Sequence, residues 1–194
     1  MKFLFDRLTA FVGGGLLLPV IGVVYLVIRF KMPDGPAFFK QKRVGRKGKL
    51  FTMVKFRSMS VGHSGSSVSV AGEARITPLG AFLRKYKLDE LPGLWNVLVG
   101  DMSLVGPRPD VPGYADKLKG EDRKVLELRP GITGPASLKY SNEEEILASV
   151  EDPIKYNDEI IFPDKVKINL DYYYNHSLIG DLKIIWNTVF RTNY

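Results

Sequence analysis

The first long apolar run of the chain extends from Leu8 to Ile28, 21 residues without a formal charge. An α-helix of about 20 residues is long enough to cross the hydrocarbon core of a bilayer. Pro19 lies in the middle of this run, where it removes a backbone donor and kinks a helix. Gly13, Gly14 and Gly15 weaken the half of the helix that precedes it. The pattern therefore predicts a membrane helix with a bend.

Basic residues flank this run on both sides. Lys2 and Arg7 precede it, and residues 29–57 contain ten Lys or Arg against one acid, Asp34. Because basic flanks stay on the cytoplasmic face, a kinked helix that enters the membrane and returns to the same side satisfies both flanks. We favour this re-entrant helix over residues 1–30, followed by a small cytosolic domain over residues 31–194. A straight span and a buried helix of a soluble protein are the alternatives.

The rest of the chain alternates between short elements and turns. Apolar and basic positions alternate over residues 36–57 around a turn at Arg46-Lys47-Gly48, which predicts a hairpin. The Ser- and Gly-rich residues 58–74 are typical of a loop, either a lid or a simple connection. Further elements are expected as helices from Thr77-Pro78, from Asp89 to Leu98, and at 111–128, 142–149, 163–175 and 178–191, with a short strand at 103–106.

The last predicted helix carries an apolar stripe made of Leu178, Leu182, Ile185, Trp186 and Val189. Packing into the core is the default explanation of such a stripe, and contact with a membrane surface is the alternative. Together the patterns predict an α+β, mostly helical fold with a short hairpin and amphipathic interfacial helices.

Composition narrows the chemistry. The chain has 194 residues and a net charge of +7, which suits an anionic partner: nucleic acid, lipid headgroups or a phosphorylated substrate. The absence of cysteine excludes disulfides and Cys-based zinc sites, and two histidines are too few for a His-rich metal site. An oxygen-liganded ion such as Mg²⁺ is compatible with the composition.

The acids Asp89 and Glu90 are the first candidates for chemistry. Alone, they are most simply explained as acids at a helix start, where they complement the helix dipole. Arg84 precedes them and Arg108 follows between two prolines, in a backbone that both rings restrict. Cations beside a carboxylate keep it ionised and stabilise a transferring phosphoryl group.

An ordered set of motifs resembles the bacterial sugar transferase family, the monotopic phosphoglycosyl transferases. The motifs are Lys55-Phe56-Arg57-Ser58-Met59, Leu88-Asp89-Glu90-Leu91-Pro92, Trp95-Asn96-Val97-Leu98, Gly100-Asp101-Met102-Ser103, Gly106-Pro107-Arg108-Pro109 and Arg129-Pro130-Gly131-Ile132-Thr133-Gly134. The resemblance covers nearly the whole chain and matches the minimal single-domain form of the family.

The resemblance implies an enzyme that transfers a phospho-sugar from a UDP-sugar to polyprenyl (undecaprenyl) phosphate and releases UMP. It implies Mg²⁺ and a covalent intermediate, with Asp89 as nucleophile and Glu90 as metal ligand. Arg108 matches the phosphate-binding arginine, and Lys55 and Arg84 match positions near the substrate phosphates. The family's bending proline matches Pro19, although Leu18 stands where the family often has serine.

The same resemblance implies location at the bacterial inner membrane, with the catalytic domain on the cytoplasmic face. Partners expected are the UDP-sugar, the polyprenyl phosphate, inner-membrane lipids and downstream glycosyltransferases, but not nucleic acid. The sequence leaves open the sugar, the glycan pathway and the oligomeric state. Two rival functions are a non-enzymatic membrane adaptor that binds anionic lipid or nucleic acid, and a glycosyltransferase that forms no covalent intermediate and releases UDP.

Overall fold

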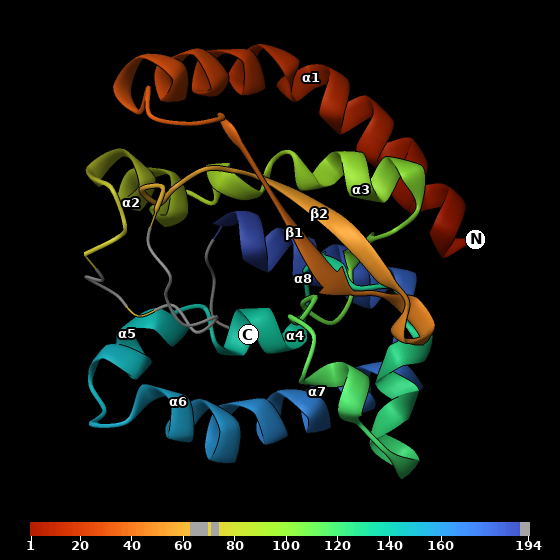
Figure 1. Ribbon diagram of the computed structural model, residues 1–194. Coiled ribbons are helices and arrows are strands. Elements are labelled where there is room, and N and C mark those ends of the chain that lie inside the picture. The colour runs from red at the N-terminus through yellow and green to blue at the C-terminus, as the bar shows by residue number, and fades with distance from the viewer. Residues whose placement is uncertain (63–69, 71–73, 191–194) are drawn as a thin grey trace.

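A computed structural model describes residues 1–62, 70 and 74–190 of the chain (Figure 1). The fold is α+β and mostly helical, as the sequence predicts, with one long N-terminal apolar helix and two small sheets. Most of the predicted loop over residues 58–74 lies outside the described residues.

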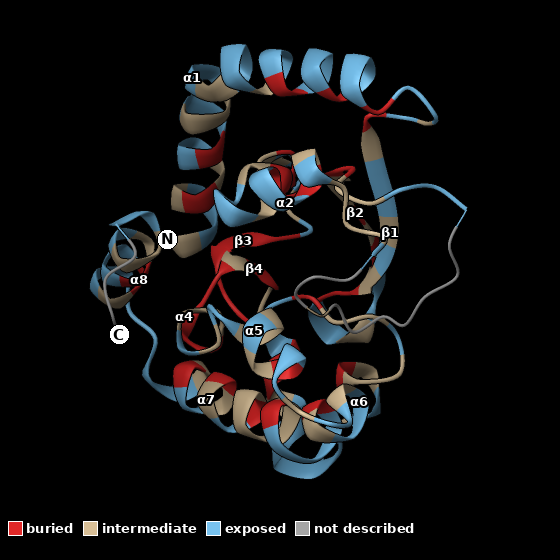
Figure 2. Cartoon of the chain, turned by 90° about the vertical axis from the view of Figure 1, so that its left-hand side faces the viewer, coloured by how far each residue is buried: buried red, intermediate tan, exposed pale blue. Residues whose placement is uncertain are grey.

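Helix α1 spans Lys2–Lys31 and contains Pro19. It is bent, and its two halves run in clearly different directions around the body of the protein (Figure 2). The N–H that a proline lacks, and the clash of its ring with the preceding turn, are the physical cause of such a bend. None of residues 11–23 is buried. The protein itself thus does not cover the middle of α1, and the whole helix, Lys2–Lys31, is by length and composition long and apolar enough to cross a membrane.

The N-terminal end of α1 is fastened to the body of the protein by buried polar contacts. Lys2 forms an ion pair with Asp181, with 2.5 Å between Nζ and Oδ2. The hydroxyl of Ser103 donates to Asp6 Oδ2 over 2.6 Å. Asp6 and Asp181 are 3% and 2% exposed, so these contacts are shielded from water and hold the helix end firmly.

The C-terminal end of α1 is fastened by a hydrophobic cluster instead. Val24, Ile28 and Met32 pack there with Ala37, Phe56 and Leu83. The buried guanidinium of Arg57 also donates to the carbonyl of Met32, which ends the helix. Both ends of α1 therefore contact the same domain, and only its middle projects away from it.

The first sheet is the predicted hairpin. Strand β1 (Phe38–Val44) pairs antiparallel with β2 (Leu50–Phe56), and the turn Arg46–Gly48 joins them. The second sheet is a parallel pair of very short strands, β3 (Ser103–Val105) and β4 (Gly131–Thr133). The strand predicted at 103–106 is confirmed, whereas β4 was not predicted.

The remaining helices are α2 (Pro78–Lys85), α3 (Gly93–Val99), α4 (Pro135–Lys139), α5 (Glu143–Ala148), α6 (Pro153–Tyr156), α7 (Phe162–Asn175) and α8 (Leu178–Phe190). The predicted start of α2 is confirmed, because Thr77 Oγ1 accepts from Gly80 N over 2.9 Å. The helix predicted at 111–128 is wrong. Two short 3₁₀ segments replace it, Ala115–Lys117 and Gly120–Glu127, because Gly113 and Gly120 adopt positive φ and interrupt the helical path.

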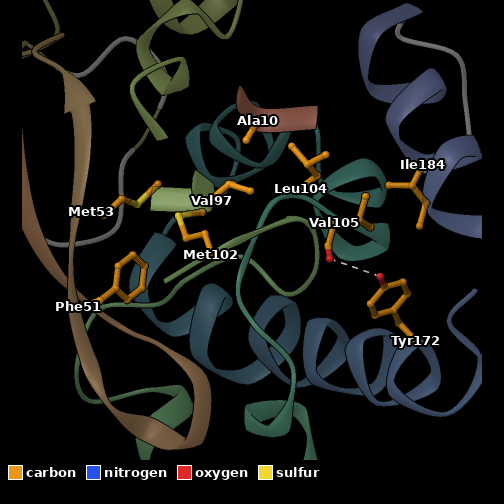
Figure 3. Close-up of a cluster of buried hydrophobic side chains, with 9 residues drawn as sticks. All are labelled: Ala10, Phe51, Met53, Val97, Met102, Leu104, Val105, Tyr172 and Ile184. Atoms are coloured by element: carbon orange, nitrogen blue, oxygen red, sulfur yellow. Dashed lines mark hydrogen bonds between the residues drawn. The ribbon is translucent and has the colours of Figure 1, made fainter. Parts of the chain in front are cut away.

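The main core joins α1, the hairpin, α3, β3, α7 and α8. It consists of Ala10, Phe51, Met53, Val97, Met102, Leu104, Val105, Tyr172 and Ile184 (Figure 3). The hydroxyl of Tyr172 lies 3.4 Å from the carbonyl oxygen of Val105 and donates its proton to Asp181 Oδ1 over 2.5 Å. Because α1 contributes Ala10 to this core, the apolar helix is an integral part of the domain at its N-terminal end.

The apolar stripe of α8 does not pack into the core as expected. Leu178, Leu182, Trp186 and Val189 of the predicted stripe are exposed, and the buried residues of the helix are Asp181 and Ile184. Core packing is therefore wrong as the explanation of these four side chains. They form an uncovered apolar face, which fits the alternative of a membrane surface.

Candidate active site

The turn that carries Arg108 is locked against a second turn. The N–H of Gly106 donates to Thr133 O over 2.9 Å, and the N–H of Gly131 donates to Pro107 O over 2.8 Å. A Cβ added to Gly131 would lie 2.2 Å from Gly106 N, so the two backbones approach too closely for any other residue. This contact and the flanking prolines give Arg108 a rigid base.

Asp89 and Glu90 lie in a short 3₁₀ turn, Leu88–Glu90, between α2 and α3. Lys87 precedes the turn in the left-handed conformation, with φ of 56°, and redirects the chain after α2. Helix α3 begins only at Gly93, and the pair supplies no capping hydrogen bond to it. The α-helix predicted to start at Asp89 therefore starts later, although both acids lie in the first turn of the 3₁₀ segment that leads into it, where acids complement a helix dipole.

Glu90 is the centre of an ion-pair cluster. Its Oε1 accepts from Lys55 Nζ over 2.9 Å and from Arg108 Nη2 over 2.8 Å. Burial acts to raise the pKa of Glu90, but the charges of Arg108 and Lys55 outweigh it and hold that pKa well below its usual range. Glu90 is therefore an ionised carboxylate whose charge is already compensated.

Asp89 is in the opposite situation. It is 8% exposed, and its Oδ1 has no hydrogen-bond partner among the described residues. Burial and the neighbouring charge of Glu90 raise the pKa of Asp89, although Lys55, Arg84 and Arg108 partly offset the shift. A buried carboxylate oxygen without a donor is costly, and such an atom is available for bonding to a ligand.

The two acids line a large open cavity of about 2100 Å³. Its lining contains more cationic than acidic side chains. The cations are Arg43, Lys55, Arg57, Arg75, Arg84, Lys85, Lys87, Arg108, Lys139 and Lys165, and the acids are Asp89, Glu90, Asp110, Glu143, Glu144 and Glu145. This arrangement suits a polyphosphate ligand and phosphoryl transfer.

Four of the predicted site residues are thus brought together: Asp89, Glu90, Lys55 and Arg108. Arg84 lines the same cavity, but its guanidinium forms an ion pair with Glu144 of α5. Pro19 lies elsewhere, in α1, and lines a separate apolar groove.

Lys55 is positioned by a side chain that sequence reasoning did not assign to the site. The buried amide of Asn96, in α3, accepts from Val54 N over 3.1 Å and donates to Thr52 O over 2.8 Å. It thereby replaces a neighbouring strand along the free edge of β2. Lys55 directly follows Val54. The two hydrogen bonds of Asn96 therefore fix the strand backbone from which the Lys55 side chain extends to Glu90.

Arg43 and Asp110 are further cavity residues that were missed. Burial raises the pKa of Asp110 to about 6, and burial with the charge of Arg108 lowers the pKa of Arg43 to about 10. Arg43 Nη1 donates to Pro109 O over 3.1 Å, which joins the hairpin to the Arg108 turn. Asp110 directly follows the Pro107-Arg108-Pro109 motif, a signal that could have found it. No such signal marks Arg43.

Arg129, a cation in the second proline-glycine turn, lies away from this cluster. Its Nε donates to Gly100 O over 3.1 Å, and its guanidinium lies 4.2 Å from the centre of the Phe3 ring. Arg129 therefore links the turn to the N-terminal end of α1, which is a structural role.

The acids also bear on metal binding. Within the described residues no group of three or more His, Cys, Asp or Glu is placed to hold a metal ion. Mg²⁺ in phosphoryl-transfer sites is commonly held by one or two carboxylates together with substrate phosphates. Lys55 and Arg108 both bind Glu90 through Oε1, so a shared metal ion would use the other oxygen of Glu90, beside the unpartnered Oδ1 of Asp89.

The protein thus combines a buried carboxylate oxygen without a partner, a cavity lined by more cations than acids, and a long apolar helix that the domain leaves uncovered. The sequence profile of the bacterial sugar transferase family matches residues 1–193. The chain belongs to this family.

Curated relatives agree with that assignment. The chain is 36% identical over 188 residues to the galactosyl transferase CpsE of Streptococcus agalactiae serotype III, covering 90% of this chain and 38% of that protein. It is 34% identical over 200 residues to the UDP-glucose:undecaprenyl-phosphate glucose-1-phosphate transferase of Klebsiella pneumoniae, covering 98% and 40%. With the uncharacterized sugar transferase EpsL of Bacillus subtilis it shares 37% over 163 residues, covering 84% and 72%. The chain thus spans about two-fifths of the longer relatives.

Proposed function

We propose that this protein is a phosphoglycosyl transferase. It moves a phospho-sugar from a UDP-sugar to polyprenyl phosphate and so begins the assembly of a bacterial surface glycan. The observation that carries the proposal is the unpartnered carboxylate of Asp89, buried beside a compensated Glu90 in a cationic cavity. The name of the Klebsiella pneumoniae relative, a UDP-glucose:undecaprenyl-phosphate glucose-1-phosphate transferase, supports the donor and acceptor.

In the first step a carboxylate oxygen of Asp89 attacks the sugar-linked phosphorus of the donor. The bond from that phosphorus to the bridging oxygen breaks, and UMP leaves with the electron pair. Arg108 and Lys55 have the positions to stabilise the charge on the transferring group, since both already converge on Glu90. The raised pKa of Asp89 reflects a carboxylate poorly stabilised as an anion, which favours bond formation to phosphorus.

In the second step a phosphate oxygen of the polyprenyl phosphate attacks the same phosphorus. The bond between Asp89 and phosphorus breaks, which frees the carboxylate and yields the polyprenyl-diphospho-sugar. Dividing the transfer into two displacements is the logic of covalent catalysis and gives ping-pong kinetics.

Mg²⁺ is the metal we propose, held by Glu90 and by substrate phosphates, where it would neutralise the diphosphate. The side chains supply the rest of the electrostatics: Arg108 binds phosphate, Lys55 holds Glu90, and Arg84 and Lys87 lie at the wall of the cavity.

We also propose that α1 enters the bacterial inner membrane from the cytoplasmic face and returns to it. A straight span would place the N-terminal end of α1 on the far side of the membrane from the domain. That arrangement would break the ion pair of Lys2 with Asp181 and the hydrogen bond between Asp6 and Ser103. The uncovered apolar face of α8 supports a position of the domain at the level of the lipid headgroups. The lipid acceptor and the soluble donor would meet at that level.

The function is tested by trapping the intermediate. Full-length protein in vesicles is incubated with Mg²⁺ and a UDP-sugar carrying a labelled sugar, without acceptor. A labelled adduct is expected on the wild type and should disappear on addition of polyprenyl phosphate, with UMP as the nucleotide product. Asp89→Asn should form none, whereas Asp101→Asn, at an exposed acid of a neighbouring motif, should label normally.

Turnover with UDP as product, or turnover of the wild type without any adduct, contradicts this mechanism. A chain that acted only as a basic adaptor would release no nucleotide, and its membrane binding would be indifferent to Asp89→Asn.

A further inference from the structure

A second concave site lies between α1 and α2, apart from the cationic cavity. It is a groove of about 420 Å³ whose nine lining residues are all apolar. Five come from α1 between Pro19 and Val27, three from α2, and the last is Leu88. Such a lining offers no polar side chain to a phosphate or a sugar and suits a hydrocarbon chain.

Helix α2 separates this groove from the cationic cavity. Leu79, Phe82 and Leu83 line the groove, whereas Arg84 and Lys85 on the same helix line the cavity. The two sites are therefore about one helix diameter apart, roughly 10 Å.

The turn after α2 connects the two sites most directly. Leu88 lines the groove, and the next residue, Asp89, lines the cavity. Consecutive Cα atoms lie about 3.8 Å apart, so the backbone passes from the lining of the groove to the lining of the cavity within one residue. A molecule with an apolar tail and a phosphate head can therefore occupy both sites at once.

The groove is also open to the lipid side. Val20, Val23 and Phe82 line it and yet are 40%, 61% and 52% exposed. These residues continue the uncovered apolar surface of α1, through which a lipid tail can enter sideways from the bilayer.

We propose that this groove binds the first isoprene units of the polyprenyl phosphate, with the phosphate head turned around the end of α2 toward Asp89. The proposal rests on the proposed function and specifies its acceptor site. The part of α1 that follows Pro19 is then a wall of the acceptor site as well as a membrane anchor. Binding the tail here would also explain how an acceptor free in the bilayer is aimed at a buried carboxylate.

The test fills the groove with a larger side chain. Val23→Trp places an indole in the groove, and Leu26→Trp places the same indole on the same half of α1 at a comparably exposed position, 53%, outside the groove lining. Both full-length variants are assayed in vesicles with long-chain polyprenyl phosphate and with methyl phosphate, an acceptor that has no isoprene unit. Adduct formation without acceptor and membrane binding are measured in parallel.

Val23→Trp should raise KM for the long-chain acceptor by about tenfold, because burial of isoprene methylenes is lost. KM for methyl phosphate, adduct formation and membrane binding should stay at wild-type values. Leu26→Trp should change none of these. Unchanged adduct formation shows that the indole has not disturbed the fold or the first step.

Equal behaviour of the two variants overturns the proposal. So does an equal loss with both acceptors, or weaker membrane binding by Val23→Trp alone, since the groove would then hold an ordinary phospholipid chain. A long-chain acceptor with a photoreactive group on its first isoprene unit gives an independent measurement. It should label the α1 and α2 segments of the wild type, and labelling confined to α8 would contradict the proposal. Failure of the proposed function itself is distinct, because the wild type would then release no UMP.

Discussion

Among the residues that the structure describes there are two pairs of buried acids, and the surroundings of the two pairs differ. Asp6 and Asp181 hold the N-terminal end of α1, and each accepts a hydrogen bond from a hydroxyl, that of Ser103 or that of Tyr172. At the other pair Glu90 is bonded to two cations, while Asp89 has a buried oxygen with no donor. The first pair stabilises the fold. The second leaves one carboxylate unsatisfied where a substrate phosphate is to arrive, which is typical of a functional site.

The largest effect is expected from Asp89→Asn. Since the amide is no nucleophile, sugar-phosphate transfer should fall by about 1000-fold or more. The folded state should survive, because this substitution removes a buried charge that has poor compensation. Initial rates of UMP release and a thermal unfolding curve measure the two effects. If Asp89→Asn were inactive only because it unfolded, Asp89 would be a structural acid like Asp6 and Asp181, and the two pairs would not differ.

Asp181→Asn should produce the reverse pattern. The change weakens a part-buried ion pair with Lys2 and disturbs the hydrogen bond from Tyr172, for a loss of about 2 kcal/mol in the free energy of unfolding. The transfer rate of the fraction that remains folded should change little. Denaturant unfolding in detergent measures the first quantity, and UMP release per folded molecule measures the second. Asp171→Asn, at an exposed acid of α7, is the matched control.

Arg108→Lys tests whether geometry or charge matters at the Glu90 cluster. A lysine keeps the charge but loses the planar fork that binds phosphate with two parallel hydrogen bonds. The expected result is a loss of about tenfold in kcat/KM for the UDP-sugar, with stability close to that of the wild type. Arg46→Lys, on the exposed hairpin turn, should leave kcat/KM unchanged. Full activity of Arg108→Lys would mean that the site requires only a positive charge.

The smallest effect is a dependence of stability on pH. The pKa of Asp89 in the folded state is raised above its ordinary value of 3.8, so ionising this group costs the folded state more than the unfolded state. Below 3.8 the group is neutral in both states, and Asp89→Asn should equal the wild type in stability. As pH rises through the folded pKa, the wild type should become the less stable of the two. Melting temperatures of the wild type and Asp89→Asn, measured in parallel across the acid range, give the difference in stability. If the stability gained by Asp89→Asn became smaller as pH rises, the pKa of Asp89 would be lowered in the folded state and the prediction would be wrong.

The sequence predicted those parts that depend on local pattern. The hairpin, the cap at Thr77, the apolar helix with Pro19 and the helices near the C-terminus all follow from periodicity or from a single residue's conformational preference. The motifs also placed Asp89, Glu90, Lys55 and Arg108 in one site. Local pattern failed where tertiary contacts decide, as in the late start of α3 and in the exposed stripe of α8.

The parts that were missed depend on contacts between distant segments. Asn96 binds the backbone of β2 at Val54 and Thr52, which lie 42 and 44 residues away in sequence. The residues around Asn96 give no sign of these hydrogen bonds. Arg43 reaches the Arg108 turn across 66 residues. The difference between Asp89 and Glu90 was likewise invisible, because it arises from which acid lies within reach of Lys55 and Arg108.

The double attachment of α1 has a consequence for the choice of membrane. A helix that spans a bilayer must match its thickness, and each ångström of mismatch costs a fraction of a kcal/mol. Helix α1 begins and ends on the same domain, so a re-entrant α1 has no far end to match to an opposite leaflet. The protein should therefore work equally well in vesicles of short-chain and long-chain lipids, and the thickness of a bilayer would not restrict the membranes in which it operates.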